Sequence, residues 1–247
     1  MPNQRDIRLL CKPIVERRSD LIHVKRYLLF VPLRSIFAGI CFEQSSDRDD
    51  LQPRPIVRAL CRMKPEFPYA GENAFRRAGY RTWREVFGES RLVEPEKLNQ
   101  IMPEPWLMSD PDYPDAIRNA IEADMLPKVA EFVSWERALE YETRDNTYGQ
   151  KSDPQILLPY FIALGEFDRA GQCLRTEHHL RIAHQAFSGY SAGLGDRLAE
   201  QGDKLSMEDK RKLVSILHER EAAAIHAMKL EKHWEPTPFP VEEEGLV

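Results

Sequence analysis

The segment from Asp153 to Arg181 constrains the fold more than any other part of the chain, because it carries the pattern of two helices joined by a tight turn. Pro154 predicts a helix start, since proline at the first helical position loses no hydrogen bond and the preceding Asp153 can cap the free amides. Apolar residues then recur at helical spacing, at Leu157, Leu158, Phe161, Ile162 and Leu164. Gly165 is expected to end this helix, since glycine adopts the left-handed conformation that follows many helices.

A second helix is predicted to begin at about Phe167. Its expected inward-facing residues are Ala170, Cys173, Leu174 and Ile182. The pattern LG-x-F-x-x-A runs through the turn from Leu164 to Ala170 and resembles the helix-to-helix turn of tetratricopeptide repeats. Leu157 and Phe161 also fall where that family places a leucine and an aromatic residue.

The resemblance covers one unit, residues 154–185, and it implies a helical hairpin. Three positions depart from the family, which prefers a small residue, an alanine and a proline where this chain has Leu158, Glu177 and Ile182. No second copy follows at a spacing of about 34 residues, and a lone repeat cannot bury its faces as a solenoid does. An ordinary hairpin within a helical bundle is therefore the preferred interpretation.

The chain has 247 residues, which suits one large domain or two small ones with a substantial core. Its four cysteines show no C-x-x-C spacing, and no apolar leader precedes a small-residue cleavage site, so we expect a reducing cytoplasm. The formal net charge of −5 disfavours nucleic-acid binding through bulk charge. Intrinsic disorder is excluded by a hydrophobic content of 42%.

Residues 27–42 form the most apolar run of the chain, and this run predicts buried core. A membrane span needs about 20 apolar residues, whereas this run is shorter and is interrupted by Pro32 and Arg34. Short strands around Val31 and a helix over 33–42 are both compatible with its composition. The following residues 43–55 are rich in Ser, Asp and Pro and predict a loop. The loop's acidic cluster is an exposed turn rather than a metal site, because the spacing of Asp47, Asp49 and Asp50 fits no calcium loop.

A patch of arginines interleaved with aromatic residues follows, within a stretch rich in proline and glycine at 65–111. Arginine for phosphates and aromatic rings for base stacking is the composition of a single-strand binder. Glutamates dilute the patch, so a solvated helix face is preferred, with Thr82 and Glu85 as its capping box. The candidate partner-binding residues of the patch are Arg76, Arg77, Tyr80, Arg81, Trp83 and Arg84.

Helical spacing returns after residue 112. Pro114 predicts a helix start, and its apolar stripe is Ile117, Ala120, Ile121 and Met125. Pro127 is expected to interrupt that helix and to begin another, whose inward residues are Val129, Phe132, Val133, Ala138 and Leu139. This pair and the hairpin predict an antiparallel helical bundle.

Residues 187–204 contain four glycines and predict a flexible connector. Gly193 and Gly195 form only a bare G-x-G, so nucleotide binding is not expected. Ser206 and Asp209 then cap a long helix that ends near Trp234. Its apolar stripe is Leu213, Val214, Leu217, Ala224, Ile225 and Met228.

Histidines give no strong metal signature. His178, His179 and His184 lack the i, i+4 spacing of a zinc helix. His226 and His233 are seven apart and share a helical face, so they form at most a weak metal or interface site. No G-x-S-x-G elbow or cysteine nucleophile signature is present. We therefore predict no catalytic, cofactor-binding or metal-binding residue.

The final segment, residues 235–247, is rich in proline and ends in acidic residues. It predicts an extended tail that is either exposed or packed as a strap. A disordered tail is the preferred interpretation, and a linear motif centred on Phe239 is the alternative.

These patterns predict a mainly α protein, with a helical bundle or short helical array in the C-terminal half and a small mixed α/β N-terminal portion. The expected segments are a mixed portion at 1–111, a helical domain at 112–234 and the tail, or else one continuous domain.

The leading functional hypothesis is a non-enzymatic protein-binding protein, such as an adaptor, a chaperone-like factor or a toxin-neutralising partner, that binds through the concave side of its helices. The first alternative is an enzyme with a site assembled from distant Asp, Glu and His residues. The second alternative is nucleic-acid binding through the arginine and aromatic patch. The sequence predicts no membrane association and leaves the oligomeric state open.

Overall fold

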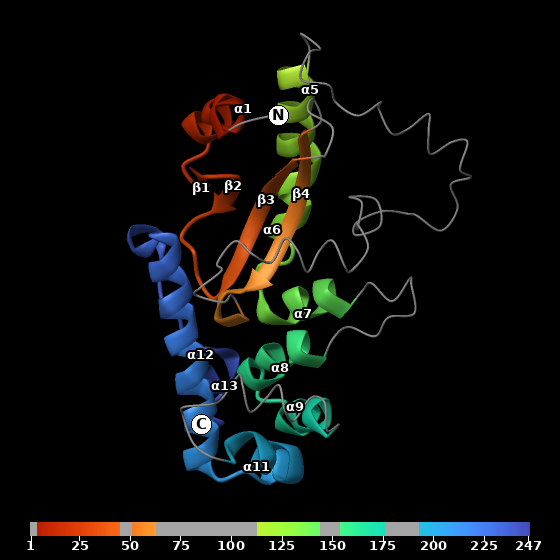
Figure 1. Ribbon diagram of the computed structural model, residues 1–247, viewed down its shortest axis with the longest axis vertical. Helices are drawn as coiled ribbons and strands as arrows, with labels where there is room; N and C mark the ends of the chain where they lie inside the picture. Colours follow the sequence, from red (N-terminus) through yellow and green to blue (C-terminus); the bar gives the residue numbers. More distant parts are fainter. Residues whose placement is uncertain (1–3, 45–50, 63–112, 144–153, 176–192) are drawn as a thin grey trace, which may run out of the picture. The chain divides into compact units, whose positions relative to one another are not determined.

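A computed structural model of the chain describes residues 4–44, 51–62, 113–143, 154–175 and 193–247 (Figure 1). These residues belong to two compact units. The sheet unit holds the described residues within 4–33, 37–57 and 113–133, and the helical unit holds those within 34–36, 58–62 and 134–247. In this division residues 113–133 belong with the sheet and residues 235–247 belong with the helices.

A four-stranded antiparallel sheet is built from the apolar run and the residues around it. Its strands, in spatial order, are β1 (Leu21–Val24), β2 (Tyr27–Phe30), β3 (Ile36–Gln44) and β4 (Leu51–Ala59). The strand interpretation of the apolar run is confirmed, and a helix over 33–42 is wrong. Every residue from Ile36 to Phe42 is buried, so β3 shows no alternation of apolar and polar residues that would identify a strand.

Strand β4 lies where the sequence predicts a loop. Pro53 and Pro55 caused that error, since proline removes a ladder donor and argues against a central strand. β4 is the last strand in the order of the sheet, where one row of backbone amides needs no partner. An edge strand therefore tolerates both prolines.

Helix α1 (Gln4–Arg17) packs against β1 and α5 in the sheet unit. It buries one apolar stripe formed by Ile7, Leu10, Cys11 and Ile14. Arg17 at its end forms an ion pair with Glu122, with Nη2 and Oε2 2.6 Å apart.

The helix after residue 112 runs through Pro127 without a break. It consists of α5 (Tyr113–Ala120), a π-helical turn (Ile121–Met125) and α6 (Leu126–Ala130). In the widened turn the amide of Leu126 donates to the carbonyl of Ile121, five residues earlier. A widened turn reduces the clash between a proline ring and the carbonyl four residues before it, so the interruption predicted at Pro127 is wrong.

The chain turns instead at residues 131–134, where Val133 is 49% exposed rather than facing inward. Helix α7 (Trp135–Thr143) follows as the first helix of the helical unit.

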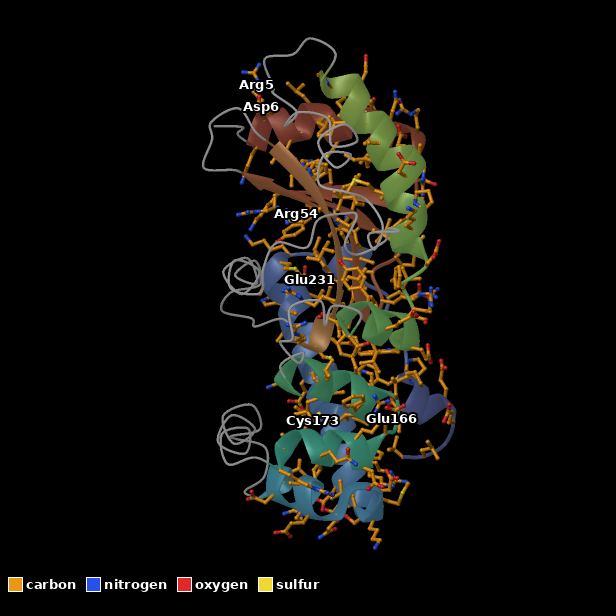
Figure 2. All side chains as sticks on the ribbon, turned by 90° about the vertical axis from the view of Figure 1, so that its right-hand side faces the viewer. Arg5, Asp6, Arg54, Glu166, Cys173 and Glu231 are labelled. Carbon is orange, nitrogen blue, oxygen red and sulfur yellow. The ribbon has the colours of Figure 1, made fainter. Side chains whose placement is uncertain are left out.

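The predicted hairpin is confirmed as α8 (Pro154–Ala163) and α9 (Phe167–Leu174). Gly165 has a φ of 74°, and its amide donates to the carbonyl of Ile162. The amide of Glu166, labelled in Figure 2, donates to the carbonyl of Phe161. These two bonds form a Schellman motif, which requires the left-handed residue that glycine supplies. Of the predicted inward-facing residues, Ala170 and Leu174 are buried and Cys173 is half-buried, whereas Ile182 lies outside the described residues.

Helix α8 is the centre of the helical unit. It is apolar all round, and from Leu158 to Ala163 every residue is buried. Helices α7, α9, α12 (Met207–Met228) and α13 (Pro240–Glu243) pack against it (Figure 1). A helix that is apolar all round is expected to be enclosed in this way.

Helix α11 (Leu194–Gln201) occupies part of the predicted flexible connector and packs against α9. Gly171 makes this close approach of the helices feasible, since a Cβ atom there would lie 2.5 Å from the carbonyl oxygen of Leu198. Of the connector's own glycines, Gly202 also lies close to α9, since a Cβ atom there would lie 2.0 Å from Oδ1 of Asp168.

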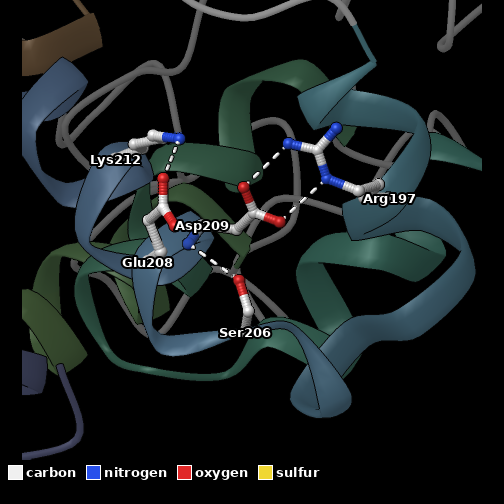
Figure 3. Close-up of polar contacts among 5 residues, drawn as sticks. All are labelled: Arg197, Ser206, Glu208, Asp209 and Lys212. Carbon is white, nitrogen blue, oxygen red and sulfur yellow. Dashed lines mark hydrogen bonds and ion pairs between the residues drawn. The ribbon is translucent and has the colours of Figure 1, made fainter.

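The long helix α12 begins as predicted. The amide of Asp209 donates to Oγ of Ser206, and the carboxylate of Asp209 accepts two hydrogen bonds from Arg197 on α11 (Figure 3). All six predicted stripe residues are buried. The helix ends at Met228 rather than near Trp234, because Lys229 adopts a left-handed conformation with a φ of 59°.

None of the helices within the described ranges is long and apolar enough to cross a membrane.

Candidate functional site

The C-terminal residues 234–247, which we call the strap, lie against the helical unit. From Trp234 to Phe239 the strap is extended, with dihedral angles at Phe239 of −79° and 157°. The short helix α13 follows. Of the two sequence interpretations, the packed strap is the one found. The prolines at 236, 238 and 240 suit an extended entry followed by a helix start.

Phe239 is the main anchor of the strap and is 0% exposed. Its ring stacks on the imidazole of His218 from α12, with centroids 4.1 Å apart and an interplanar angle of 13°. The indole of Trp135 from α7 meets the same ring edge-on at 5.3 Å and 84°. Burial of a phenylalanine contributes about 1.5–3 kcal/mol, and an aromatic pair adds about 0.5–1.5 kcal/mol.

A carboxylate fixes the strap three residues after the anchor. Oε2 of Glu242 accepts a hydrogen bond from the amide of Phe239 at 2.7 Å, which is one half of a capping box. The same oxygen lies 2.8 Å from Nε2 of His218. His218 therefore contacts the strap twice, through its face and through its edge.

The strap is also seated on the turn between α8 and α9. Val241 is fully buried, and a Cβ atom at Gly165 would lie 3.1 Å from Cγ2 of Val241 and 3.1 Å from Cδ1 of Leu246. Gly165 is thus required both for the turn and for the approach of the strap. At the other end, Oγ1 of Thr237 lies 3.4 Å from Oγ of Ser35.

Glu221 on α12 lies one helical turn from His218 and is 0% exposed. Nδ1 of His218 lies 3.7 Å from Oε2 of Glu221. Among the residues that the structure describes, neither carboxylate oxygen of Glu221 has a hydrogen-bond partner within 3.5 Å, although His218 and Ser35 are near enough to oppose the rise of its pKa. Burial raises the pKa of Glu221, because a charged carboxylate loses its hydration there.

The imidazole of His218 stands between two carboxylates. Glu221 and then Glu242 raise the pKa of His218, against the opposing effect of partial burial. A cation between two anions is stabilised by both, so the charged form of His218 is favoured.

Two further polar groups lie near this cluster. Burial, and then the charge of Glu221, raises the pKa of the Cys61 thiol, so the group stays protonated and is a poor nucleophile. Burial also raises the pKa of Tyr160. The Tyr160 hydroxyl accepts from the amide of Ala59 at 3.0 Å and lies 3.5 Å from Oε1 of Glu142. The hydroxyl of Tyr160 thus ties α8 to the end of β4, and neither Cys61 nor Tyr160 is an activated nucleophile.

The predicted site residues divide sharply. The patch residues Arg76, Arg77, Tyr80, Arg81, Trp83 and Arg84 lie outside the described residues. Phe239 is the one predicted site residue whose position is described, and its ring faces the chain's own helices rather than solvent. As placed in the structure, it cannot serve as an exposed motif.

The candidate metal ligands of the sequence also fall partly outside the described residues. Asp47, Asp49, Asp50, His178, His179 and His184 lie outside the described residues. His226 and His233 do not share a helical face, because α12 ends at Met228. His226 instead lies 2.8 Å from Glu231, which is labelled in Figure 2. A search of the described part of the chain finds no group of His, Cys, Asp and Glu side chains able to hold a metal ion.

Sequence reasoning missed His218, Glu221 and Glu242. Glu221 occupies a position of the buried stripe, four residues from Leu217 and from Ile225. A charged residue at such a position is itself a signal. The P-V-E sequence after Phe239 is likewise a helix-start pattern, with proline first and an acid third.

Comparisons with protein-family models, with curated proteins and with solved structures each returned no match.

Proposed function

We propose that this protein is a non-enzymatic protein-binding protein, and that its helical unit binds an extended segment of a partner at the place where its own strap lies. The supporting observation is the way the strap is held, by one fully buried aromatic anchor at the end of a proline-rich extended segment. Linear peptides bind folded proteins in the same manner, with an anchor residue supplying most of the affinity.

The contacts define the chemistry of a matching partner segment. An aromatic ring would lie between Trp135 and His218, and a carboxylate three residues later would meet the imidazole. A branched apolar residue between them would reach the turn at Gly165, as Val241 does. Flanking prolines lower the entropy lost on binding, because they restrict the free segment to extended conformations.

The enzyme alternative receives less support from the same residues. His218, Glu221 and Glu242 do come together from separate parts of the sequence, as that hypothesis requires. However, the ring of Phe239 covers one face of His218, whose side chain is 34% exposed, and Glu221 is fully buried, so a substrate would not reach the carboxylate without moving the groups packed around it. Binding of a strap-like segment explains these contacts without a further step.

Competition between the strap and a free peptide tests the proposal. A tethered segment has an effective concentration in the millimolar range, so a labelled peptide of residues 235–247 should bind the wild-type chain poorly. Full-length Phe239→Ala should bind it much more tightly, since losing a buried phenylalanine weakens the chain's own strap by more than about 100-fold. Fluorescence anisotropy measures both affinities.

Two matched controls make the result specific. A peptide in which alanine replaces the phenylalanine should bind neither chain. Glu244→Ala changes an exposed strap residue and should leave the wild-type behaviour intact. If Phe239→Ala keeps its helical circular dichroism and still binds no peptide, the proposal is wrong. If it binds, affinity capture with Phe239→Ala as bait and wild type as reference would identify partners that carry such a segment.

A further inference from the structure

His218 connects the strap to the buried carboxylate of α12. Nε2 lies 2.8 Å from Glu242 on the strap, and Nδ1 lies 3.7 Å from Glu221 on its own helix. Only the charged imidazole has a proton on both nitrogens. A neutral imidazole can donate to one carboxylate only, and its second nitrogen then presents a lone pair to the other.

Other charged or titratable groups face this cluster from the elements packed against it. They are Cys61 and Arg62 from the turn Leu60–Arg62, Arg220 from α12, Glu142 from α7 and Tyr160 from α8. Arg62 forms an ion pair with Glu142, with Nη1 and Oε1 2.5 Å apart. This pair is thus satisfied locally. His218 is the group that contacts both Glu221 and the strap.

We propose that charged His218 holds the strap in place, so that the strap stays bound in mildly acidic conditions and is released as the pH rises past neutrality. Strap release itself depends only on this geometry, whereas its role in controlling partner binding rests on the proposed function. Release would uncover the site of Phe239 and hydrate Glu221. A hydrated carboxylate is stable without a charged imidazole beside it.

The direction follows from proton linkage. The ordinary pKa is about 6.5 for histidine and about 4.3 for glutamate. Glu221, and then Glu242 of the strap, raise the pKa of His218, and burial, with a smaller effect of the Glu242 charge, raises the pKa of Glu221. The share of Glu242 exists only while the strap is closed, so closing the strap takes up protons. The contribution of His218 is complete below its ordinary pKa and disappears as the pH rises through the raised value. Glu221 acts in the same direction from a lower pH, and each proton changes the closing equilibrium by at most about tenfold per pH unit.

Hydrogen exchange of the strap amides measures this equilibrium in the full-length protein. In the closed structure the amides of Glu242, Glu244 and Leu246 donate to carbonyls within the strap. Their protection factors, corrected for the intrinsic pH dependence of exchange, should fall steadily between pH 5.5 and 8.5, by at most about tenfold per pH unit for each proton released. The amide of Lys210 at the start of α12 serves as an internal reference and should keep its protection.

Three variants separate the contributions. His218→Gln should show low strap protection with a smaller pH dependence, because only the contribution of Glu221 is left. Glu221→Gln should keep the strap amides protected at pH 8.5, because the buried charge is removed. Glu242→Gln should reduce the pH dependence of strap protection and leave the protection of the Lys210 amide unchanged. Constant protection in the wild type would overturn the proposal, and so would an unchanged slope in His218→Gln.

The outcome also separates this inference from the proposed function. A pH-dependent strap in a chain that never binds the labelled peptide would support the role of His218 and refute partner binding at this site. A strap that is insensitive to pH in a chain that binds the peptide would do the reverse.

Discussion

Helix α12 carries two acidic side chains that are buried to a similar extent but whose pKa values are shifted in opposite directions. Asp209, in its first turn, is 8% exposed, and Glu221, farther along, is 0% exposed. The carboxylate of Asp209 accepts bonds of 2.8 and 2.7 Å from Arg197, which lower the pKa of Asp209 (Figure 3). Glu221 has no such donors among the described residues, and burial raises its pKa. Hydrogen-bond donors rather than depth therefore decide which form of a carboxyl is stable.

The two carboxyls make stability depend on pH in opposite ways. A lowered pKa at Asp209 contributes stability above the ordinary aspartate value of about 3.9, and that stability is lost as the pH falls through the lowered value. The raised pKa of Glu221 makes the folded chain lose stability as the pH rises. The ion pair of Asp209 and Arg197 joins α11 to α12 at neutral pH. Glu221 and His218 form a contact that depends on pH.

Of the substitutions that test this difference between Asp209 and Glu221, Glu221→Met should change the free energy of unfolding the most. A buried charge without hydrogen bonds is often less stable than an apolar side chain of similar volume, so Glu221→Met should raise the free energy of unfolding at pH 8 by about 2 kcal/mol. At pH 5 the gain should shrink, because the wild-type cluster holds more protons there. Urea denaturation at both pH values measures the difference.

A matched change on the exposed face of α12, Glu219→Met, should alter the unfolding free energy by less than about 0.5 kcal/mol. A net loss of stability in Glu221→Met at pH 8 would show that the carboxylate has partners that offset its burial.

Asp209→Asn should remove the part of the stability that depends on pH in the acidic range. The wild-type chain should be more stable than the variant above about pH 4, and the two should converge as the pH falls, since protonation removes the same charge from the wild type. Urea midpoints measured from pH 2 to 6 test this. In an Arg197→Gln background the same substitution should have little effect, because the ion pair is already absent. Parallel curves that never converge would contradict the assignment.

Local signals account for the parts of the fold that the sequence predicted. Gly165 and Ser206 act on amides within a few residues, so the turn and the helix start are visible in short patterns. The same is true of the buried stripe of α12. At Pro127 the local rule failed, because a single π-helical turn allowed the helix to continue.

The candidate site was hidden because its parts are distant in sequence. Phe239 lies 104 positions after Trp135, with which it packs, and nothing near residue 239 indicates an aromatic partner. Composition alone made the strap resemble a disordered tail. Glu221 was passed over because an apolar stripe directs attention to the residues that fit it, although the exception carries more information about the site.

The smallest effect concerns the cap of α12. Ser206 accepts a hydrogen bond from the amide of Asp209 at 3.1 Å and is exposed, so its loss leaves no cavity. Ser206→Ala should lower the free energy of unfolding by about 1 kcal/mol, the usual cost of losing an N-cap. The loss should be equal at pH 5 and pH 8, because a hydroxyl does not titrate in this range, whereas the effect of Glu221→Met should change between them. Urea denaturation at the two pH values provides the test, with Ser206→Asp as the variant that should retain the cap. If the loss of stability in Ser206→Ala also changed with pH, the groups around Asp209 and those around Glu221 would be energetically coupled. The two ends of α12 could then not be treated as independent.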